Sequence, residues 1–426
     1  MVEKRKPIAV KDAIEKVLGF SRVGQIEHVA LQESYGRFLA VDLVADHAVP
    51  PFDRSPYDGF AIRSIDTISA SADLPVEFEV IDEIGAGYVS DHLLGERQAI
   101  RIMTGAQIPN GCDAVVMLEL TKVSKRNDKV FMSIKRPFKK GDNISFAGED
   151  TLKGSTLVKK GAYITPGIVA LLATFGYDTV PVVYKPRIGI IATGSELLDV
   201  RETLVPGKIR NSNSFMIEAQ CRRGGAKPIY FGKLMDNLDE CFLAVQNALR
   251  SVDFLITTGG VSVGDYDYLP EIYKRLGANV LFNKVAMRPG SVTTVAEVNG
   301  KLLFGLSGNP SACYVGFELF VRPIVRTFLH NERPHLQKIK AVLGKDFLKP
   351  NPFTRFVRGQ LTFSDGKISV SPVGLDKSNV VTSLADANVF IVLPGGSRGY
   401  QMGDMVDVLL IEDQTGSETS WAESFK

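Results

Sequence analysis

The spacing of hydrophobic and polar positions changes several times along the first half of the chain. Residues 10–20 repeat apolar side chains at helical spacing, which predicts a first helix. The paired prolines at positions 50 and 51 then exclude a continuing helix. From about residue 74 to 136 the pattern becomes short β-type runs separated by turn residues, and residues 164–172 return to helical spacing. The first half therefore predicts a small β-rich module inserted into another domain.

From Pro186 onward, short buried runs typical of strands alternate with helical stretches. The predicted strands are residues 188–192, 229–231, 254–257 and 302–306, and the predicted helices are 213–223, 238–249, one ending near 276, and 311–328, the last split before Pro323. Alternation with connections long enough for a crossover predicts a parallel α/β sheet. After Pro334 the pattern is again of β type, as in residues 356–361 and 389–393.

These changes predict a multidomain protein of α/β type with additional β-rich modules. The predicted divisions are a discontinuous N-terminal linking or dimerisation domain from residues 1–50 and 137–177, an inserted β-rich domain from 51–136, an α/β domain from 178–328, a C-terminal β domain from 329–413, and a polar tail from 414–426. We expect the polar tail to be frayed.

Composition excludes several classes of protein. A 45% hydrophobic and 23% charged chain of 426 residues is typical of a soluble globular protein. Fifty basic and 48 acidic residues leave a net charge of +2, so nucleic acid is not an expected partner. No apolar run approaches the roughly 20 residues that cross a bilayer. Four scattered cysteines without metal-ligand spacing favour a reducing compartment, and we expect a cytoplasmic protein.

Three glycine-containing loops follow predicted strands of the α/β domain. In doubly wound sheets, ligands bind outside the carboxyl ends of the strands. Glycine lets backbone N–H groups approach an anion, and the start of the next helix favours negative charge. One such loop alone is often only a steric turn, but three at one sheet edge predict a phosphate or nucleotide cleft. The predicted ligand-binding residues are Thr193, Gly194, Ser195, Gly259, Gly260, Ser262, Gly264, Gly308, Asn309 and Pro310.

Carboxylates accompany these loops. Carboxylates repel phosphate, so their position beside anion-binding glycines predicts a bridging divalent cation such as Mg²⁺. Glu196 and Asp267 each follow a glycine turn by a short step and are the predicted metal ligands. Asp236 follows another strand, whereas Asp265 equally suits a helix cap.

Two further groups of polar residues are candidates. Lys284 and Arg288, four positions apart, lie on one side of the chain and suit an oxyanion, although exposed cations usually have no ligand. In the N-terminal half, a turn rich in proline and aromatic residues would hold Asp58 at a fixed place, and residues 148–150 form a second acidic turn. The alternative for both turns is ordinary turn chemistry.

Six motifs, in this order along the chain, resemble those of the MoeA family of molybdopterin molybdenumtransferases, which includes the E domain of gephyrin. The motifs are Pro50-Pro51-Phe52-Asp53 through Asp58-Gly59, Thr104-Gly105-Ala106 with Asp113-Ala114-Val115-Val116, Gly148-Glu149-Asp150, Thr193-Gly194-Ser195-Glu196-Leu197, Gly259-Gly260-Val261-Ser262-Val263-Gly264 with Asp267-Tyr268, and Gly308-Asn309-Pro310. The match runs from about residue 7 to residue 410. Six ordered motifs are far more specific than any single glycine loop.

The resemblance implies an elongated four-domain protomer that dimerises, with a central doubly wound α/β domain similar to the MogA-type molybdopterin adenylyltransferases. It implies a cleft between this domain and the N-terminal part of the partner subunit. The implied catalytic residues Asp58, Thr104 and Asp150 would face the cleft across the dimer interface. The resemblance also implies that Glu196, Asp236 and Asp267 serve the nucleotide and its Mg²⁺, that Lys284 and Arg288 bind molybdate, and that Arg358 and Ser378 line the same region.

The chain departs from the family at two places. The family commonly has Lys-Pro-Gly-Lys-Pro where this chain has Arg288-Pro289-Gly290-Ser291-Val292, which removes one positive charge near the expected oxyanion site. It also commonly has Leu-Pro-Gly-Asn-Pro where this chain has Leu306-Ser307-Gly308-Asn309-Pro310, which alters the stiffness of the loop. The first departure leaves open which oxyanion is bound.

The expected reaction inserts molybdate into adenylylated molybdopterin and releases AMP, in molybdenum cofactor biosynthesis alongside other proteins of that process. Three alternatives remain: a molybdopterin adenylyltransferase, a tungstate-specific paralogue, and a molybdopterin-binding scaffold without catalysis. The extra terminal domains argue against the first alternative, and the cleft carboxylates argue against the scaffold. A dinucleotide dehydrogenase is disfavoured because no Gly-x-Gly-x-x-Gly follows the first strand of the sheet.

Overall fold

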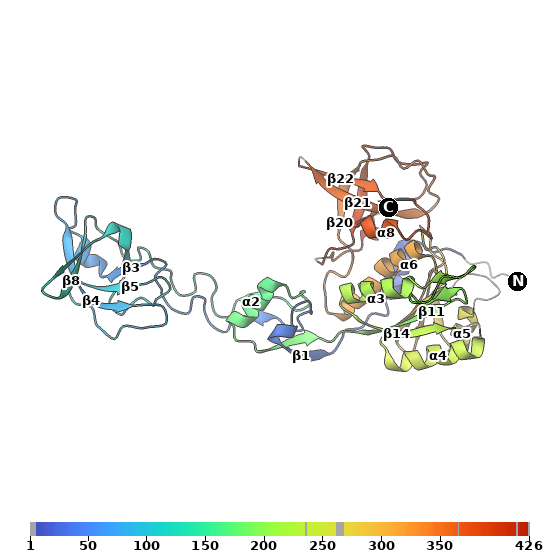
Figure 1. The fold of residues 1–426 in the computed structure, drawn as a ribbon, viewed down its shortest axis with the longest axis horizontal. Helices are drawn as coiled ribbons and strands as arrows, with labels where there is room; N and C mark the ends of the chain where they lie inside the picture. The colour runs from blue at the N-terminus through green and yellow to red at the C-terminus, as the bar shows by residue number, and fades with distance from the viewer. Residues whose placement is uncertain (1–5, 235–236, 261–267, 365, 415, 425–426) are drawn as a thin grey trace. The chain divides into compact units, whose positions relative to one another are not determined.

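The computed structural model describes residues 6–234, 237–260, 268–364, 366–414 and 416–424. The chain forms two compact units, and Figure 1 labels some of their helices and strands. Unit 1 consists of residues 1–41, 159–173 and 177–426, and unit 2 consists of residues 42–158 and 174–176. In the described part of the chain, no helix has the length and apolar character that crossing a membrane requires.

Unit 2 is built on a six-stranded sheet in the order β6-β3-β5-β4-β8-β7. The strands are β3 (Gly59–Ile62), β4 (Val76–Ile84), β5 (Gln98–Ile102), β6 (Ala114–Met117), β7 (Lys122–Arg126) and β8 (Lys129–Ile134), with short helices η2 (Ser64–Thr67) and η3 (Leu118–Leu120). Only β4 and β5 pair in parallel within this sheet. Phe60, Phe78 and Met132 are fully buried in its core, as expected of alternating strand positions. A small ribbon of β2 (Leu43–Val44) and β9 (Thr156–Val158) completes the unit.

The α/β part of unit 1 contains a second six-stranded sheet, ordered β14-β11-β15-β19-β18-β16. Its strands are β11 (Arg187–Thr193), β14 (Lys227–Leu234), β15 (Phe254–Thr258), β16 (Asn279–Phe282), β18 (Thr294–Val298) and β19 (Lys301–Leu306). The first four in spatial order are parallel, as the sequence predicts. Strand β18 runs against its two neighbours, β19 and β16. Asn299 and Gly300, which both have positive φ, form the tight hairpin between β18 and β19.

Helices cover both faces of this sheet, which confirms the doubly wound prediction (Figure 1). One face packs α3 (Asn213–Gly224), α6 (Pro310–Gly316), the π-helical segment η4 (Phe317–Val321) and α7 (Arg322–Phe328). The other packs α4 (Leu238–Ser251) and α5 (Leu269–Arg275). The first predicted helix is α1 (Val10–Leu18), which buries its apolar stripe in the core of the first face. Helix α2 (Pro166–Thr174) matches the predicted helical segment 164–172.

A third six-stranded sheet forms the C-terminal part of unit 1, ordered β17-β21-β22-β20-β24-β23 and closed by pairing of β21 with β23. The strands are β17 (Met287–Arg288), β20 (Lys338–Leu343), β21 (Thr354–Ser364), β22 (Lys367–Pro372), β23 (Val389–Leu393) and β24 (Met405–Leu410), with helix α8 (Ser383–Asp386). Strand β17 comes from the segment predicted to belong to the α/β domain. Its pairing places Arg288 opposite Arg355 of β21.

Two small strand pairings and two short helices complete unit 1. The antiparallel strands β1 (Ile26–Ala30) and β10 (Thr179–Val183) form one ribbon, followed by the short helix η1 (Leu31–Glu33). The parallel strands β12 (Leu197–Leu198) and β13 (Ile209–Arg210) form another, beside the first glycine loop. The short helix η5 (Trp421–Ser424) follows the last strand.

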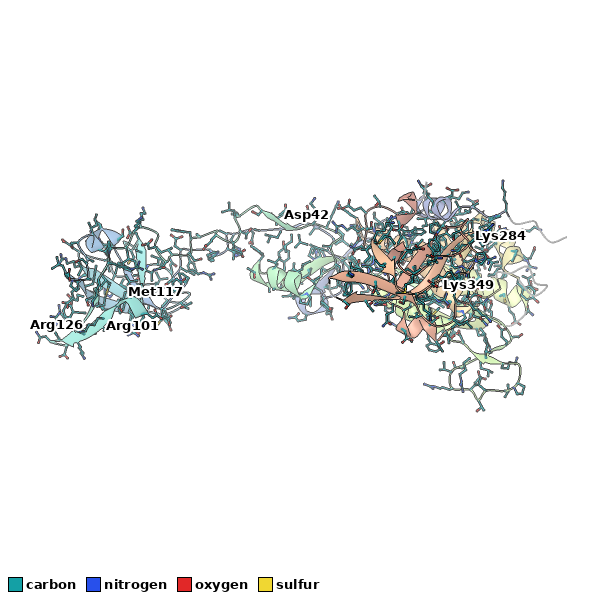
Figure 2. All side chains as sticks on the ribbon, turned by 90° about the horizontal axis from the view of Figure 1, so that it is seen from above. Asp42, Arg101, Met117, Arg126, Lys284 and Lys349 are labelled. Carbon is teal, nitrogen blue, oxygen red and sulfur yellow. The ribbon has the colours of Figure 1, made fainter. Side chains whose placement is uncertain are left out.

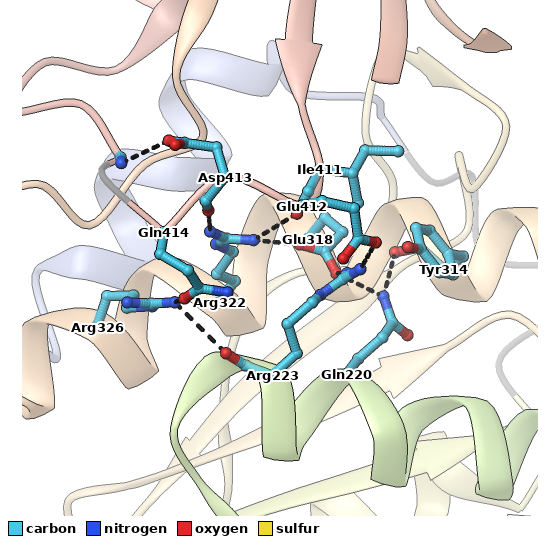
Figure 3. A network of polar contacts seen from close by, with 11 residues as sticks. Gln220, Arg223, Tyr314, Glu318, Arg322, Arg326, Ile411, Glu412, Asp413 and Gln414 are labelled. Carbon is cyan, nitrogen blue, oxygen red and sulfur yellow. Dashed lines mark hydrogen bonds and ion pairs between the residues drawn. The ribbon is translucent and has the colours of Figure 1, made fainter. Parts of the chain in front are cut away.

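The prediction of a frayed tail after residue 413 is wrong for the part that the structure describes. Trp421 is 4% exposed, and its ring packs edge-on against Phe356 at 5.3 Å between centroids. Arg322 donates to the Asp413 carbonyl at 2.5 Å, and Arg326 donates to the Gln414 side chain (Figure 3). The segment is polar overall, but it contains one buried tryptophan, and the residues at its start accept hydrogen bonds from two buried arginines. These contacts hold the segment against the core.

Candidate functional site

A cavity of about 990 Å³ lies at the carboxyl ends of the parallel strands of unit 1. It is lined by all three predicted loops, through Thr193, Gly194, Ser195, Glu196, Gly259, Gly260, Ser307, Gly308 and Asn309. Because parallel strands end at one edge, loops that are far apart in sequence meet there. The convergence of the three loops on one cavity agrees with the sequence prediction.

The loops approach each other so closely that the contact between Gly259 and Thr193 requires glycine. Gly259 has φ of +87°, and a Cβ atom there would lie 2.6 Å from the Thr193 carbonyl oxygen. Asn213, at the start of α3, donates from Nδ2 to the Gly308 carbonyl at 2.8 Å and to Thr258 Oγ1 at 3.3 Å. The edges of the cavity are therefore held by backbone contacts and by one buried amide that the sequence prediction missed.

Replacing Gly259 by alanine is expected to lower the free energy of unfolding by about 1–3 kcal/mol and to weaken ligand binding, because it adds a steric clash to left-handed backbone strain. Gly277→Ala is the matched control, since Gly277 also has positive φ but a Cβ there would meet open space. Denaturant unfolding of both variants measures the difference. Equal losses would show that the contact with Thr193 contributes nothing.

Glu196 places a carboxylate on the wall of the cavity, folded back against Gly194. Among the residues that the structure describes, no group of three His, Cys, Asp or Glu side chains could hold a metal ion. Mg²⁺ commonly takes one or two carboxylates and completes its shell with phosphate oxygens and water. Glu196 fits such a partial donor set. The predicted residues Asp236, Ser262, Gly264 and Asp267 lie outside the described residues.

The larger cavity also has apolar lining residues. They are Ile209, Leu234, Leu269 and Ile272, and Cys241 and Tyr268 line it as well. A cavity lined by both glycine loops and aliphatic side chains suits a ligand that has an anionic part and a flat, less polar part.

A smaller cavity of about 430 Å³ adjoins the first, and the two share Gly290, Ser291 and Ser378. Arg288 and Ser378, both predicted from the sequence, line this smaller cavity. The prediction missed two further cations on its wall, Arg355 and Lys377. Their signal in the sequence is weak: one arginine within a strand, and a short polar run at residues 376–379 between two β segments.

Three predicted ligand residues line neither cavity. Lys284 is half-buried and its carbonyl accepts a hydrogen bond from the Ile8 N–H at 3.1 Å, and Pro310 is the first residue of α6. Arg358 is 1% exposed and donates to Asp376 Oδ1 at 3.2 Å. Burial lowers the pKa of Arg358, although the Asp376 carboxylate opposes that shift. Arg358 thus lies behind the lining of the smaller cavity, where it holds the loop that carries Lys377 and Ser378.

In unit 2, Asp58 and Thr104 lie together as predicted. Asp58 precedes β3 and Thr104 follows β5, and these strands are paired neighbours. Asp58 Oδ1 accepts hydrogen bonds from the Thr104 N–H at 2.7 Å and from its hydroxyl at 2.9 Å. These bonds, with a smaller contribution from the charge of Arg101 (labelled in Figure 2), lower the pKa of the exposed Asp58 carboxyl. The carboxylate is thus oriented and kept ionised.

Asp150, the third predicted catalytic residue, lies in a different turn of unit 2. Its N–H donates to the Val49 carbonyl at 3.0 Å, and its side chain is exposed. Within the described residues of unit 2, no hydrogen bond or ion pair to its carboxylate is found. The structure thus orients Asp58 and leaves Asp150 without a fixed partner.

Comparison with known proteins covers almost the whole chain. Residues 8–176 match the family model described as MoeA N-terminal region (domain I and II), residues 189–327 match a probable molybdopterin binding domain, and residues 340–411 match the MoeA C-terminal region (domain IV). A Bacillus subtilis (strain 168) protein named molybdopterin molybdenumtransferase is 64% identical, over 99% of this chain and 98% of its own. Its namesake from Staphylococcus aureus (strain MSSA476) is 52% identical, over 98% and 99%.

A solved structure shows the same fold. The crystal structure of a molybdopterin biosynthesis moeA protein from Pyrococcus horikosii matches with a TM-score of 0.82 and 30% sequence identity. The match covers 95% of this chain and 99% of that chain.

Proposed function

This chain belongs to the MoeA family of molybdopterin molybdenumtransferases, and we propose that its two adjoining cavities bind the two substrates of that reaction. The larger cavity takes adenylylated molybdopterin, and the smaller cavity takes molybdate. Transfer of molybdenum to the dithiolate sulfurs is accompanied by release of AMP. The enzyme thus acts in molybdenum cofactor biosynthesis, and its product passes to other proteins of that process.

The shared wall of the two cavities carries this proposal. Gly290, Ser291 and Ser378 line both, so an oxyanion in one is adjacent to a ligand in the other. Both substrates are anionic and repel each other in water. Fixed backbone dipoles on one side and Arg288 with other cations on the other side offset that repulsion and orient the reactants.

We assign Mg²⁺ to the phosphate side of the larger cavity, where Glu196 would be a ligand and Asp267 a second one. The charge of the ion offsets the negative charge of the phosphates when it is bound. Ser195, next to Glu196 in the first loop, also lines the larger cavity, and its hydroxyl would bind a phosphate oxygen. The glycine loops supply backbone donors without side chains that would keep the phosphates away.

The active form in this proposal is a homodimer in which Asp58, Thr104 and Asp150 of each subunit serve the cleft of the other. The support from the described residues is local: Asp58 is exposed, ionised and oriented by two hydrogen bonds. A carboxylate in that state can hold a water molecule or accept a proton.

Release of AMP tests the proposed function. Purified protein with adenylylated molybdopterin and Mg²⁺ is expected to release AMP when molybdate is added, and to stop when Mg²⁺ is chelated. Release with tungstate but not with molybdate would favour the tungstate-specific paralogue, which the missing lysine at position 291 keeps open. No release of AMP with either oxyanion, together with tight binding of the pterin, would instead identify a scaffold.

A further inference from the structure

The smaller cavity has a charge distribution that the motifs alone do not reveal. The charged residues on its wall are Arg288, Arg355, Asp376 and Lys377. Asp376 is already occupied: its Oδ2 accepts from Arg355 Nη1 at 2.6 Å, and its Oδ1 accepts from the buried Arg358. Lys349, labelled in Figure 2, lies 3.7 Å from the same carboxylate. An anion entering the cavity therefore meets a carboxylate whose charge is more than offset by its three cationic neighbours.

Lys377 differs from these cations because only its backbone is fixed. Its N–H donates to the Leu375 carbonyl at 2.9 Å, and its carbonyl accepts from Arg358 Nη2 at 3.3 Å. The neighbouring Ser378 carbonyl accepts from the Ser311 N–H at 3.0 Å. In the described part of the chain, no hydrogen bond or ion pair to the ammonium of Lys377 is found. The loop is held at both ends, while the charge that it carries is available to a ligand.

Arg288 is the second available cation. It is exposed, and in the described residues its guanidinium has no carboxylate partner. Parallel pairing of β17 with β21 holds its backbone beside Arg355. Arg355 itself is already hydrogen-bonded, since its Nε donates to Asn351 Oδ1 at 2.7 Å and its Nη1 donates to Asp376. Two free cations from separate segments thus line a cavity large enough for a tetrahedral oxyanion.

We propose that Lys377 is a specificity-determining residue that binds the oxyanion opposite Arg288 and supplies the positive charge absent at Ser291. This inference rests on the proposed function of the smaller cavity. Ser291 and Lys377 line the same cavity, so a cation on either residue reaches the same space. Lys284, the other cation expected at the oxyanion, lines neither cavity, so the second cation comes from the C-terminal sheet domain.

The full-length protein and molybdate are sufficient for the first test. Direct binding of molybdate, measured by equilibrium dialysis with metal analysis, is expected to weaken about 10-fold or more in Lys377→Ala, because a charge-assisted contact is lost. Lys377→Arg is expected to retain most of the affinity. Lys367→Ala removes the same charge from the β21–β22 hairpin, outside both cavities, and is expected to bind like the unmodified protein.

A variant that moves the positive charge from position 377 to position 291 tests whether the charge, rather than its position in the chain, is what binds molybdate. In Ser291→Lys combined with Lys377→Ala, binding of molybdate is expected to recover, because the cavity regains its second free cation. In AMP-release assays, Lys377→Ala is expected to raise the half-saturating molybdate concentration with little change in the maximal rate or in the half-saturating pterin concentration.

The outcomes distinguish this inference from the proposed function. Molybdate-dependent AMP release that is indifferent to Lys377 would overturn the inference and keep the function. Binding that depends on Lys377 without any AMP release would keep the oxyanion site and overturn the function. A fall in maximal rate with unchanged half-saturation, or no recovery in the variant that moves the charge to position 291, would also overturn the role assigned to Lys377.

Discussion

Glu318→Ala is expected to lower the free energy of unfolding of unit 1 by about 3–5 kcal/mol, because it leaves buried cations without their counter-ion. Glu318 is 1% exposed and lies in the π-helical segment η4. Its Oε1 accepts from Gln220 Nε2 at 2.7 Å and from Arg223, and its Oε2 accepts from the buried Arg322 at 3.3 Å (Figure 3). Burial would lower the pKa of Arg223, but Glu318 holds that pKa above its ordinary value.

Glu412→Ala is the matched control, since Glu412 also pairs with Arg223 but its side chain is 63% exposed. We expect that change to cost about 0–1 kcal/mol, as exposed ion pairs do. Trp421 is the only tryptophan in the sequence and is buried in unit 1, so its fluorescence during urea unfolding reports on that unit. Equal effects of the two substitutions on the free energy of unfolding would contradict the role of Glu318 as the counter-ion of the buried arginines. Glu318→Gln keeps the volume and tests whether charge or packing is responsible.

The largest effect on activity is expected from Asp58→Ala, which should slow AMP release by about 10²–10⁴-fold if Asp58 acts in proton transfer. Asp73→Ala, an exposed carboxylate of the same unit, is expected to leave the rate unchanged. Asp150→Ala, measured beside it, shows which of the two predicted carboxylates acts. An unchanged rate in Asp58→Ala would remove this residue from the mechanism.

The pH profile gives an independent measure of the same residue. The Thr104 N–H and hydroxyl lower the pKa of Asp58 below its ordinary value near 4, so the carboxylate stays ionised above that pH. Activity that needs the ionised form is lost only as the pH falls through the lowered value. Thr104→Val removes the hydroxyl donor and should shift the acid limb of the rate to higher pH. A profile that does not move would show that Asp58 does not set this limb.

The glycine loops could be predicted from the sequence because their signal is local. A buried strand, a glycine turn and a helix start are contiguous, and parallel strands bring their ends to one edge. The same reasoning placed Thr193, Gly259 and Gly308 on one cavity. Asp58 and Thr104 could be expected together only through the family resemblance, since 46 residues separate them.

The second cavity could not be predicted because it depends on long-range pairing. Strand β17 joins the C-terminal sheet rather than the α/β sheet, and this pairing brings Arg288 beside Arg355 and the loop of Lys377. A two-residue strand leaves no periodic signal. Arg358 matched the family pattern, but its burial, which decides its role, follows from packing that no local pattern records.

The docked segment after β24 also has consequences during protein synthesis. Trp421 and helix α1 belong to one hydrophobic core, so that core cannot be completed until almost the whole chain has left the ribosome. Contacts between such distant residues slow folding and prolong the exposure of apolar surface. Residues 42–158, by contrast, form most of unit 2 without an interruption and can fold while translation continues. The nascent chain therefore carries unit 2 already folded while the core of unit 1 is still incomplete. A chaperone would be most useful at that stage.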